Sequence, residues 1–210
     1  SRLAHVDGGH RTVVVVHLVG HRGAAPADLR RPLIPSARGL RLTLSVDPPP
    51  LDPDELDALG AVVDAWFART LEENPILEAV ERDPDAGPME RRWFARVVGE
   101  EKDTSTIRFT LRQRMLHHET YVMPAPEENH GAFHQHLLKR NSSLVGAAFC
   151  VGEEDAVLLV GAVPASTVDA AELDRLLGTV WTAVERCFRS ALRIGFASRV
   201  GGLPRAHGAS

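Results

Sequence analysis

The chain has 210 residues, of which 44% are hydrophobic and 25% charged, the ordinary mixture of a globular protein. Its formal charge of −4 argues against a protein that binds nucleic acid through charge alone, and its two cysteines exclude a disulfide scaffold and favour a reduced, cytoplasmic location. No apolar run reaches the roughly 18 residues of a membrane-spanning helix, so we expect no membrane span.

Residues 1–50 differ in composition from the rest of the chain. Seven arginines and three acidic residues give them a formal charge of +4, whereas 17 basic and 25 acidic residues give residues 51–210 a charge of −8. We expect a basic, Pro/Gly-rich and poorly ordered extension over 1–50, a folded domain over 51–198 and a flexible tail over 199–210. A basic arm that contacts an acidic partner is the functional alternative for the extension.

The first helix begins at a clear start signal. Asp52 suits the N-terminal cap, Pro53 the first helical position, and Glu55 completes a capping box. Apolar residues then recur at helical spacing at Leu56, Leu59, Val63, Trp66, Phe67 and Leu71. We expect the helix to end at Asn74-Pro75 or at Asp83-Pro84.

Strand-like runs follow this helix. Residues 91–98 form one strand, which Gly99 closes. Residues 104–123 alternate apolar and polar side chains, but they are too long for one strand, so we expect a bend near 115–118 that divides them into two.

Residues 124–129 are expected to open a second helix, with Asn141 at its C-terminal cap. The apolar runs 144–151 and 156–163 predict a hairpin of two central strands, both covered at least in part on each face.

A last helix is expected from residue 170 to about 192, with Gly195 as its end. Asp169 and Glu172 form a second capping-box pattern at its start. Its apolar stripe consists of Leu173, Leu176, Leu177, Val180, Trp181, Val184, Cys187, Phe188 and Leu192. The order α-β-β-β-α-β-β-α predicts an α+β fold, an antiparallel sheet of about five strands packed by helices.

The sequence lacks the motifs of common catalytic and nucleotide-binding sites. It has neither a P-loop nor a nucleophile elbow, and it shows no βαβ alternation. Cys150 and Cys187 are interpreted as small core residues. Carboxylate pairs such as Glu127 and Glu128 fall in turns or at helix starts, where acidic residues have structural roles. We therefore expect no enzymatic activity and no cofactor.

Histidines are the best candidates for a metal site. His130 and His134 are four residues apart on the second helix, a spacing that puts two imidazoles on one face, and His117 and His118 lie on a nearby strand. The pattern lacks the glutamate of a His-Glu-x-x-His motif, because Gly131 follows His130. Solvated histidines are the simpler interpretation.

Arginines form the most informative set. Arg92 and Arg96 are expected to alternate on one strand, and Arg108, Arg112 and Arg114 on the next. If the strands pair, one face of the sheet carries a basic patch that could bind an acidic peptide or a phosphate-bearing ligand. The simpler alternative is a solvated face that Glu100, Glu101 and Glu119 neutralise.

From Trp93 to about Val200 the chain resembles the YbjN family of bacterial sensory transduction regulators, and its actinobacterial branch most strongly. The resemblance is carried by the strings at 119–130, 137–141, 152–157, 172–178 and 193–198. It implies a fold similar to type III secretion chaperones, which bind protein segments and often form homodimers. It implies no catalytic residues.

Two functional hypotheses follow. The first is a non-enzymatic, chaperone-like or regulatory protein that binds a segment of a protein partner and forms a homodimer, without nucleic acid or membrane. The second is a small-molecule or metal-binding protein centred on the histidines of the second helix. A scaffolding role for residues 1–50 is a third possibility.

Overall fold

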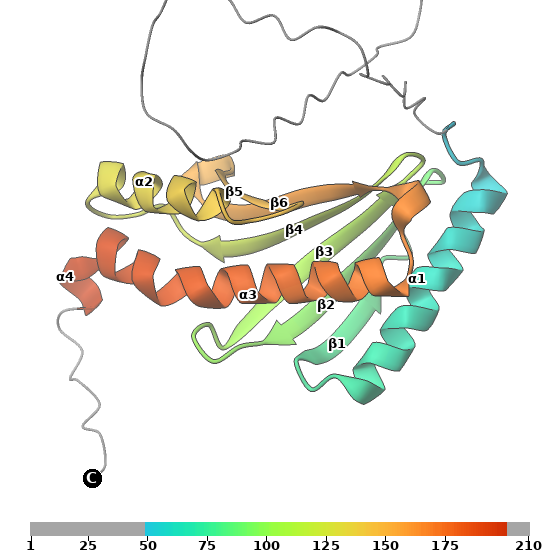
Figure 1. Cartoon of the computed structure of the whole chain (residues 1–210), viewed down its shortest axis with the longest axis horizontal. Helices are drawn as coiled ribbons and strands as arrows, with labels where there is room; N and C mark the ends of the chain where they lie inside the picture. Colours follow the sequence, from blue (N-terminus) through green and yellow to red (C-terminus); the bar gives the residue numbers. More distant parts are fainter. Residues whose placement is uncertain (1–48, 201–210) are drawn as a thin grey trace, which may run out of the picture. The chain divides into compact units, whose positions relative to one another are not determined.

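A computed structural model describes residues 49–200 (Figure 1). The helices are α1 (Pro53–Glu73), α2 (His130–Asn141), α3 (Ala170–Gly195) and α4 (Ala197–Val200). The strands are β1 (Leu77–Arg82), β2 (Glu90–Val98), β3 (Thr104–Arg112), β4 (Met115–Met123), β5 (Ala148–Val151) and β6 (Val157–Pro164). The extension and tail predicted at the two ends lie outside the described residues, apart from 49–50 and 199–200.

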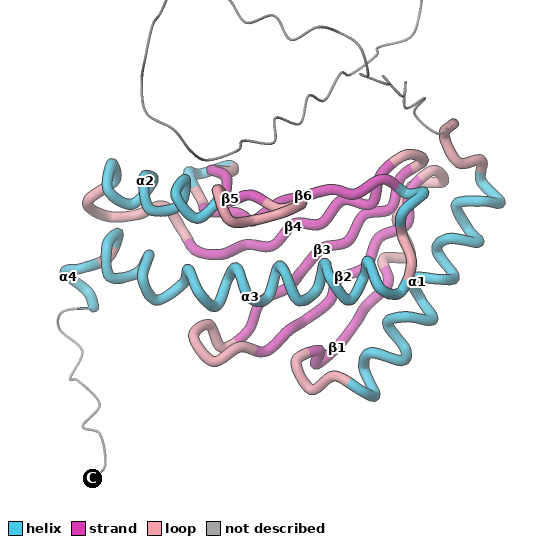
Figure 2. Tube along the Cα trace, viewed as in Figure 1, coloured by secondary structure: helices cyan, strands magenta, loops and turns pink. Residues whose placement is uncertain are grey.

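The strands form one antiparallel sheet in the order β1-β2-β3-β4-β6-β5 (Figure 2). α1 and α3 cross one face of the sheet, and α2 lies beside α3 at the β5 end (Figure 1). The predicted α+β class is therefore confirmed, with six strands in place of about five. No helix among residues 49–200 is long and apolar enough to cross a membrane.

The additional strand is β1, an edge strand that the sequence pattern concealed. Its sequence is Leu-Glu-Ala-Val-Glu-Arg, and only Leu77 is buried. A strand that pairs on one side and faces water needs few apolar residues, so it shows no clear alternation. The first helix ends before it, with Asn74 as the C-terminal cap, which confirms the first of the two expected ends.

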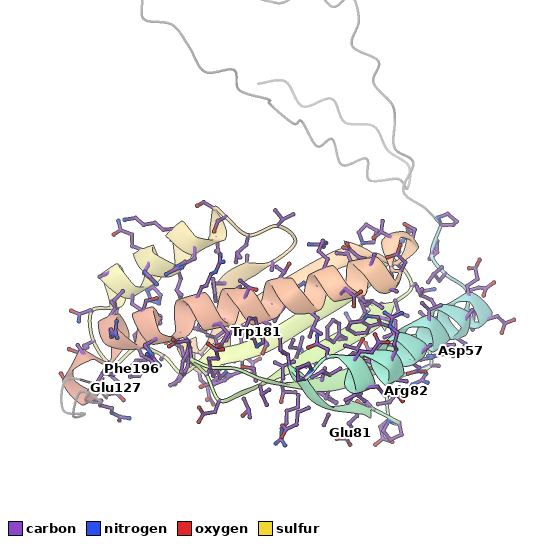
Figure 3. The ribbon with its side chains drawn as sticks, turned by 60° about the horizontal axis from the view of Figure 1, so that its bottom comes forward. Asp57, Glu81, Arg82, Glu127, Trp181 and Phe196 are labelled. Atoms are coloured by element: carbon purple, nitrogen blue, oxygen red, sulfur yellow. The ribbon has the colours of Figure 1, made fainter. Side chains whose placement is uncertain are left out.

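The core lies between the helices and the inward-pointing residues of the sheet. Most of the predicted stripe of α3 is buried: Leu173, Leu176, Leu177, Val180, Val184 and Cys187. Trp181, Phe188 and Leu192 are partly buried at its margin. The three indole N–H groups have acceptors within 2.8 Å, namely Asp174 for Trp66, Asp64 for Trp93 and the Val98 carbonyl for Trp181. Trp181 lies on α3 (Figure 3).

The predicted start of the second helix is wrong, because residues 124–129 form a loop. The backbone N–H groups of Glu127 and Glu128 donate to the Gly195 carbonyl at 2.9 and 3.1 Å, and the Asn129 side chain donates to the Ile194 carbonyl at 2.9 Å. These bonds satisfy carbonyl groups at the C-terminal end of α3. Asn129 has a left-handed conformation with φ 54°, and α2 begins after it.

Two strand predictions also need correction. The bend between β3 and β4 lies at residues 113–114, just before the expected position. Of the run 144–151, only Ala148–Val151 forms a strand, and β5 lies at the edge of the sheet rather than in its centre. Residues 144–147 are irregular because they turn through Gly146, whose φ is +75°.

Both predicted N-terminal caps are present. Asp52 accepts the N–H of Glu55, and Glu55 accepts the N–H of Asp52, which is a complete capping box. At α3, Asp169 accepts the N–H of Glu172, but the Glu172 side chain binds Arg175 instead of completing the box.

Candidate protein-binding surface

Four of the five predicted arginines share one surface of the sheet, on the side opposite the helices. Trp93, Ala95 and Val97 of β2 are buried, so Arg92 and Arg96 point away from the core. β3 alternates in the same way and directs Arg108 and Arg112 to the same side. We call this surface the outer face; its side chains are Arg92, Phe94, Arg96, Thr106, Arg108, Thr110, Arg112, His117, Glu119, Tyr121, Leu158, Val160 and Ala162.

The fifth arginine, Arg114, lies in the turn between β3 and β4. It is therefore at the end of the hairpin rather than on the face of a strand. In Figure 1 the helices lie in front of the sheet, so the outer face points away from the reader. No described helix covers it.

Every arginine of the outer face has a carboxylate partner. Arg92 binds Asp83 at 2.8 Å and also binds Glu90, and Arg112 binds Glu90 at 2.8 Å. Arg108 binds Glu119 at 2.9 Å, and Arg96 lies 3.6 Å from Glu78. The outer face is thus a network of ion pairs, half-buried at Arg92 and Glu90 and exposed at Arg108 and Arg96, rather than a field of one sign.

Glu90 is the centre of this network. Burial alone would raise the pKa of its carboxyl group, but hydrogen bonds from Arg112 and Arg92 hold the pKa below its usual value. The Glu90 hydrogen bond likewise raises the pKa of Arg92. Both charges therefore persist at neutral pH, and the ion pair between Glu90 and Arg112 links β2 to β3.

Of the three acidic residues expected to neutralise the arginines, Glu100, Glu101 and Glu119, only Glu119 does so. Glu119 pairs with Arg108, as the alternative interpretation expected. Glu101 instead pairs with Arg189 of α3, and the N–H of Glu100 donates to Glu185. Register between neighbouring strands decides the partners, and this was not visible in the sequence.

An apolar area adjoins the ion pairs on the outer face. Tyr121 of β4 is 50% exposed and lies opposite Leu158 of β6. Glu119 lies opposite Val160, so the charged rows continue into aliphatic side chains across the sheet. A surface of this kind can contact both apolar and acidic groups of a partner.

The four candidate histidines do not form one centre. His117 is exposed on the outer face, whereas the adjacent His118 is buried on the helix side, where its Nε2 lies 3.1 Å from the Gly146 carbonyl oxygen. His130 and His134 are on α2. Residues 49–200 contain no group of three or more histidine, cysteine, aspartate or glutamate residues able to hold a metal ion.

The cysteines differ from each other. Cys187 is buried in α3, and burial raises the pKa of its thiol to about 11, as suits an inert core residue. Cys150 is only partly buried on the edge strand β5, so its assignment to the core is wrong. Burial also raises its pKa.

The acidic residues expected in turns have structural partners. Glu128 accepts the N–H of Ser198 at 2.6 Å, and Glu127 binds Arg199 at 2.7 Å. Both contacts tie the loop before α2 to the C-terminal helices. The carboxylates are therefore engaged in holding the fold.

Comparison with known proteins finds a family that is similar to the central part of the chain. Residues 91–193 match the YbjN family model, described as "Putative bacterial sensory transduction regulator". This match covers 103 of the 210 residues, so residues 91–193 are similar to the YbjN family. It begins in β2 and extends into the last turn of α3, so it includes the outer-face arginines, and it confirms the resemblance expected from the sequence.

Uncharacterised mycobacterial proteins are similar to about half of the chain. A segment of 109 residues is 32% identical to an uncharacterised protein of Mycobacterium leprae and covers 52% of this chain and 59% of that protein. A segment of 102 residues is 33% identical to an uncharacterised protein of Mycobacterium tuberculosis and covers 49% of this chain and 56% of that protein. The chain thus spans less than two thirds of the length of the curated relatives it matches.

Two solved structures are similar to the chain. One is the Yersinia pestis type III secretion chaperone SycH in complex with a fragment of YscM2, with 13% identity, a TM-score of 0.38, and coverage of 62% of this chain and 97% of that chain. The other is the HopA1–SchA chaperone–effector complex, with 14% identity, a TM-score of 0.43, and coverage of 67% and 99%. At these identities the similarity concerns the fold alone.

Proposed function

We propose that the chain is a non-catalytic, protein-binding domain whose outer face receives a segment of a protein partner. The observation that supports this most directly is the uncovered outer face, where ion-paired arginines adjoin the half-exposed Tyr121. The arginines bind carboxylates of the partner, and Tyr121 with the aliphatic residues of β6 binds its apolar side chains.

The existing ion pairs are compatible with such binding. The side chain of Arg112 is 60% exposed, but that of its partner Glu90 is only 15% exposed. The side chains of Arg108 and Glu119 are 46% and 37% exposed, so this pair lies in water and contributes little to stability. A carboxylate of a partner can therefore replace or share a pair at low cost, and the interaction should weaken with added salt. Arg114 at the end of the hairpin would extend the cationic side of this surface.

The finer parts of the hypothesis are also proposals. A regulatory or chaperone-like role of this domain would operate through the binding of a protein partner. A homodimer, which the family resemblance implies, and a cytoplasmic location, which the two cysteines favour, belong to the same proposal.

The test is affinity purification with the full chain from its own host, using three baits. The wild type should capture a partner, and the double substitution Arg108→Ala and Arg112→Ala should reduce the captured amount about tenfold. Arg69→Ala is the matched control, because Arg69 on α1 is also 46% exposed and ion-paired. Equal capture by all three baits would contradict the assignment of binding to the outer face.

A further inference from the structure

A second concave surface lies on the helix side of the sheet, between α3 and the segment 143–149 that leads from α2 into β5. It is a groove of about 530 Å³. In Figures 1 and 3, α2 and this segment run alongside α3. Because it lies on the opposite side of the sheet, the groove shares no residue with the outer face.

One wall of the groove is apolar. Leu144, Val145 and Phe149 line the groove on the side of the segment 143–149, and Ala183 lines it on the side of α3. Val145 is 75% exposed, the highest exposure of any large hydrophobic residue among 49–200. An aliphatic side chain held open beside a concave surface is typical of a contact site for another molecule.

The other wall is cationic, and its charge is only partly used. Arg175 is engaged by both oxygens of Glu172. Arg140 has a single hydrogen bond of 3.4 Å, to the Ser190 hydroxyl. Arg186 forms no hydrogen bond or ion pair with any residue of the described range.

Asp174 is the one acidic residue that lines the groove, and it does not neutralise Arg140 or Arg186. Asp174 accepts the indole N–H of Trp66 at 2.7 Å and lies 4.0 Å from Arg69 of α1. It is three turns from Arg186 along α3, since the two are 12 residues apart. The unused positive charge therefore belongs to Arg140 and Arg186, next to the apolar wall.

Addition of a strand to β5 does not explain the groove. The Asn141 side chain accepts the N–H of Phe149 at 2.7 Å and donates to its carbonyl oxygen at 3.1 Å. These two bonds occupy the free edge of β5 at its centre, as a neighbouring strand would. A ligand would therefore lie in the groove through its side chains rather than extend the sheet.

We propose that this groove binds an acidic segment of a protein partner that also carries apolar side chains. Carboxylates pair with Arg186 and Arg140, and the apolar side chains pack on Val145 and Leu144. A nucleic acid fits less well, because the wall is aliphatic, the one aromatic lining residue, Phe149, is only 5% exposed, and the chain carries a net charge of −4. The proposal is independent of the outer face.

Fluorescence anisotropy with the full chain and synthetic peptides tests this proposal. The probes are three labelled pools of peptides about ten residues long: one of glutamate and leucine, one with lysine in place of glutamate, and one with serine in place of leucine. We expect the glutamate–leucine pool to bind most tightly and to be released by salt. Arg186→Glu should weaken its binding about tenfold or more.

Arg193→Glu is the matched control, because Arg193 is also an exposed arginine of α3 but lines neither the groove nor the outer face. It should leave peptide binding unchanged, whereas a partner that uses the outer face would be lost with Arg108 and Arg112. Absence of binding by the glutamate–leucine pool would overturn the proposal. Equal binding by the lysine pool, equal losses for Arg186→Glu and Arg193→Glu, or tighter binding of a single-stranded oligonucleotide would also overturn it.

Discussion

The carboxylate of Glu185 on α3 holds the turn between β2 and β3, and its removal should destabilise the domain strongly. One oxygen accepts the backbone N–H groups of Glu100 at 2.7 Å and of Glu101 at 2.8 Å, and the other accepts that of Lys102 at 3.3 Å. The helix thereby binds the sheet through three charge-assisted hydrogen bonds in one place.

The magnitude follows from what each donor loses. Truncation by Glu185→Ala returns the exposed N–H of Glu100 to water, at a cost of about 0.5 kcal/mol. The N–H groups of Glu101 and Lys102 are part-buried, and each would cost about 1–1.5 kcal/mol if left without an acceptor. We expect a total loss of about 3 kcal/mol. Glu185→Gln keeps one acceptor oxygen and should lose about half as much.

Urea denaturation of the full chain, followed by circular dichroism and tryptophan fluorescence, measures this loss. Glu172→Ala is the matched control on the same helix, because it removes only an exposed ion pair with Arg175 and should cost no more than about 1 kcal/mol. A loss below about 1 kcal/mol for Glu185→Ala, or one equal to that of the control, would refute the reasoning.

Three further predictions concern Asn141 of α2, the glycines of β6 and α3, and His118 of β4. Asn141→Ala removes two part-buried hydrogen bonds to the backbone of β5 and should lower the free energy of unfolding in urea by about 2 kcal/mol; no change would show that this edge needs no cap. Gly161→Ala would place a methyl carbon 2.0 Å from the Gly146 carbonyl oxygen, so it should destabilise by about 1–3 kcal/mol, whereas Gly178→Ala on α3 meets nothing within 4 Å and should stabilise by about 1 kcal/mol. Burial lowers the pKa of His118 below its ordinary value of 6.5, despite the hydrogen bond to Gly146, so the unfolded chain takes up the proton first and stability is lost as the pH falls below about 6.5. His118→Gln should therefore lose less stability than the wild type between about pH 7 and about pH 5 in thermal unfolding, and an equal loss would contradict the assignment.

The helices α1 and α3 could be predicted because their signals are local. Asp52 and Glu55 are three residues apart, and the capping box they form needs no other part of the chain. The apolar residues of α3 recur at helical spacing over the whole helix, so the helical period is clear from the sequence, even though the residues at the margin of the apolar stripe are only partly buried. The alternation in β2 and β3 likewise placed the outer-face arginines on one side.

Elements that depend on distant contacts were not visible in the sequence. The loop at 124–129 carries helix-start residues, but α3 captures its backbone N–H groups at Gly195, and this prevents the earlier start. Only the second half of the apolar run 144–151 forms a strand, because the chain must turn at Gly146 and pass over Gly161.

The candidate site was predictable only in part for the same reason. The carboxylates that pair with the outer-face arginines come from β1, β2 and β4 and the loop between β1 and β2, and only the strand register selects them. The groove joins Val145 to Arg186, which are 41 positions apart in the sequence. In the sequence, Val145 is one residue of an apolar run, and nothing there indicates that it is exposed beside Arg186.

Site-specific photo-crosslinking in the native host tests the central claim most directly. A photoreactive residue would replace Tyr121 on the outer face of the full chain, and Leu71 on α1, which is 40% exposed, is the control position. We expect position 121 to crosslink one defined segment of a protein partner, identified by mass spectrometry, and the double substitution Arg108→Ala and Arg112→Ala to abolish that product. The same products from both positions, or no product from position 121 while position 71 captures the partner, would contradict binding at the outer face.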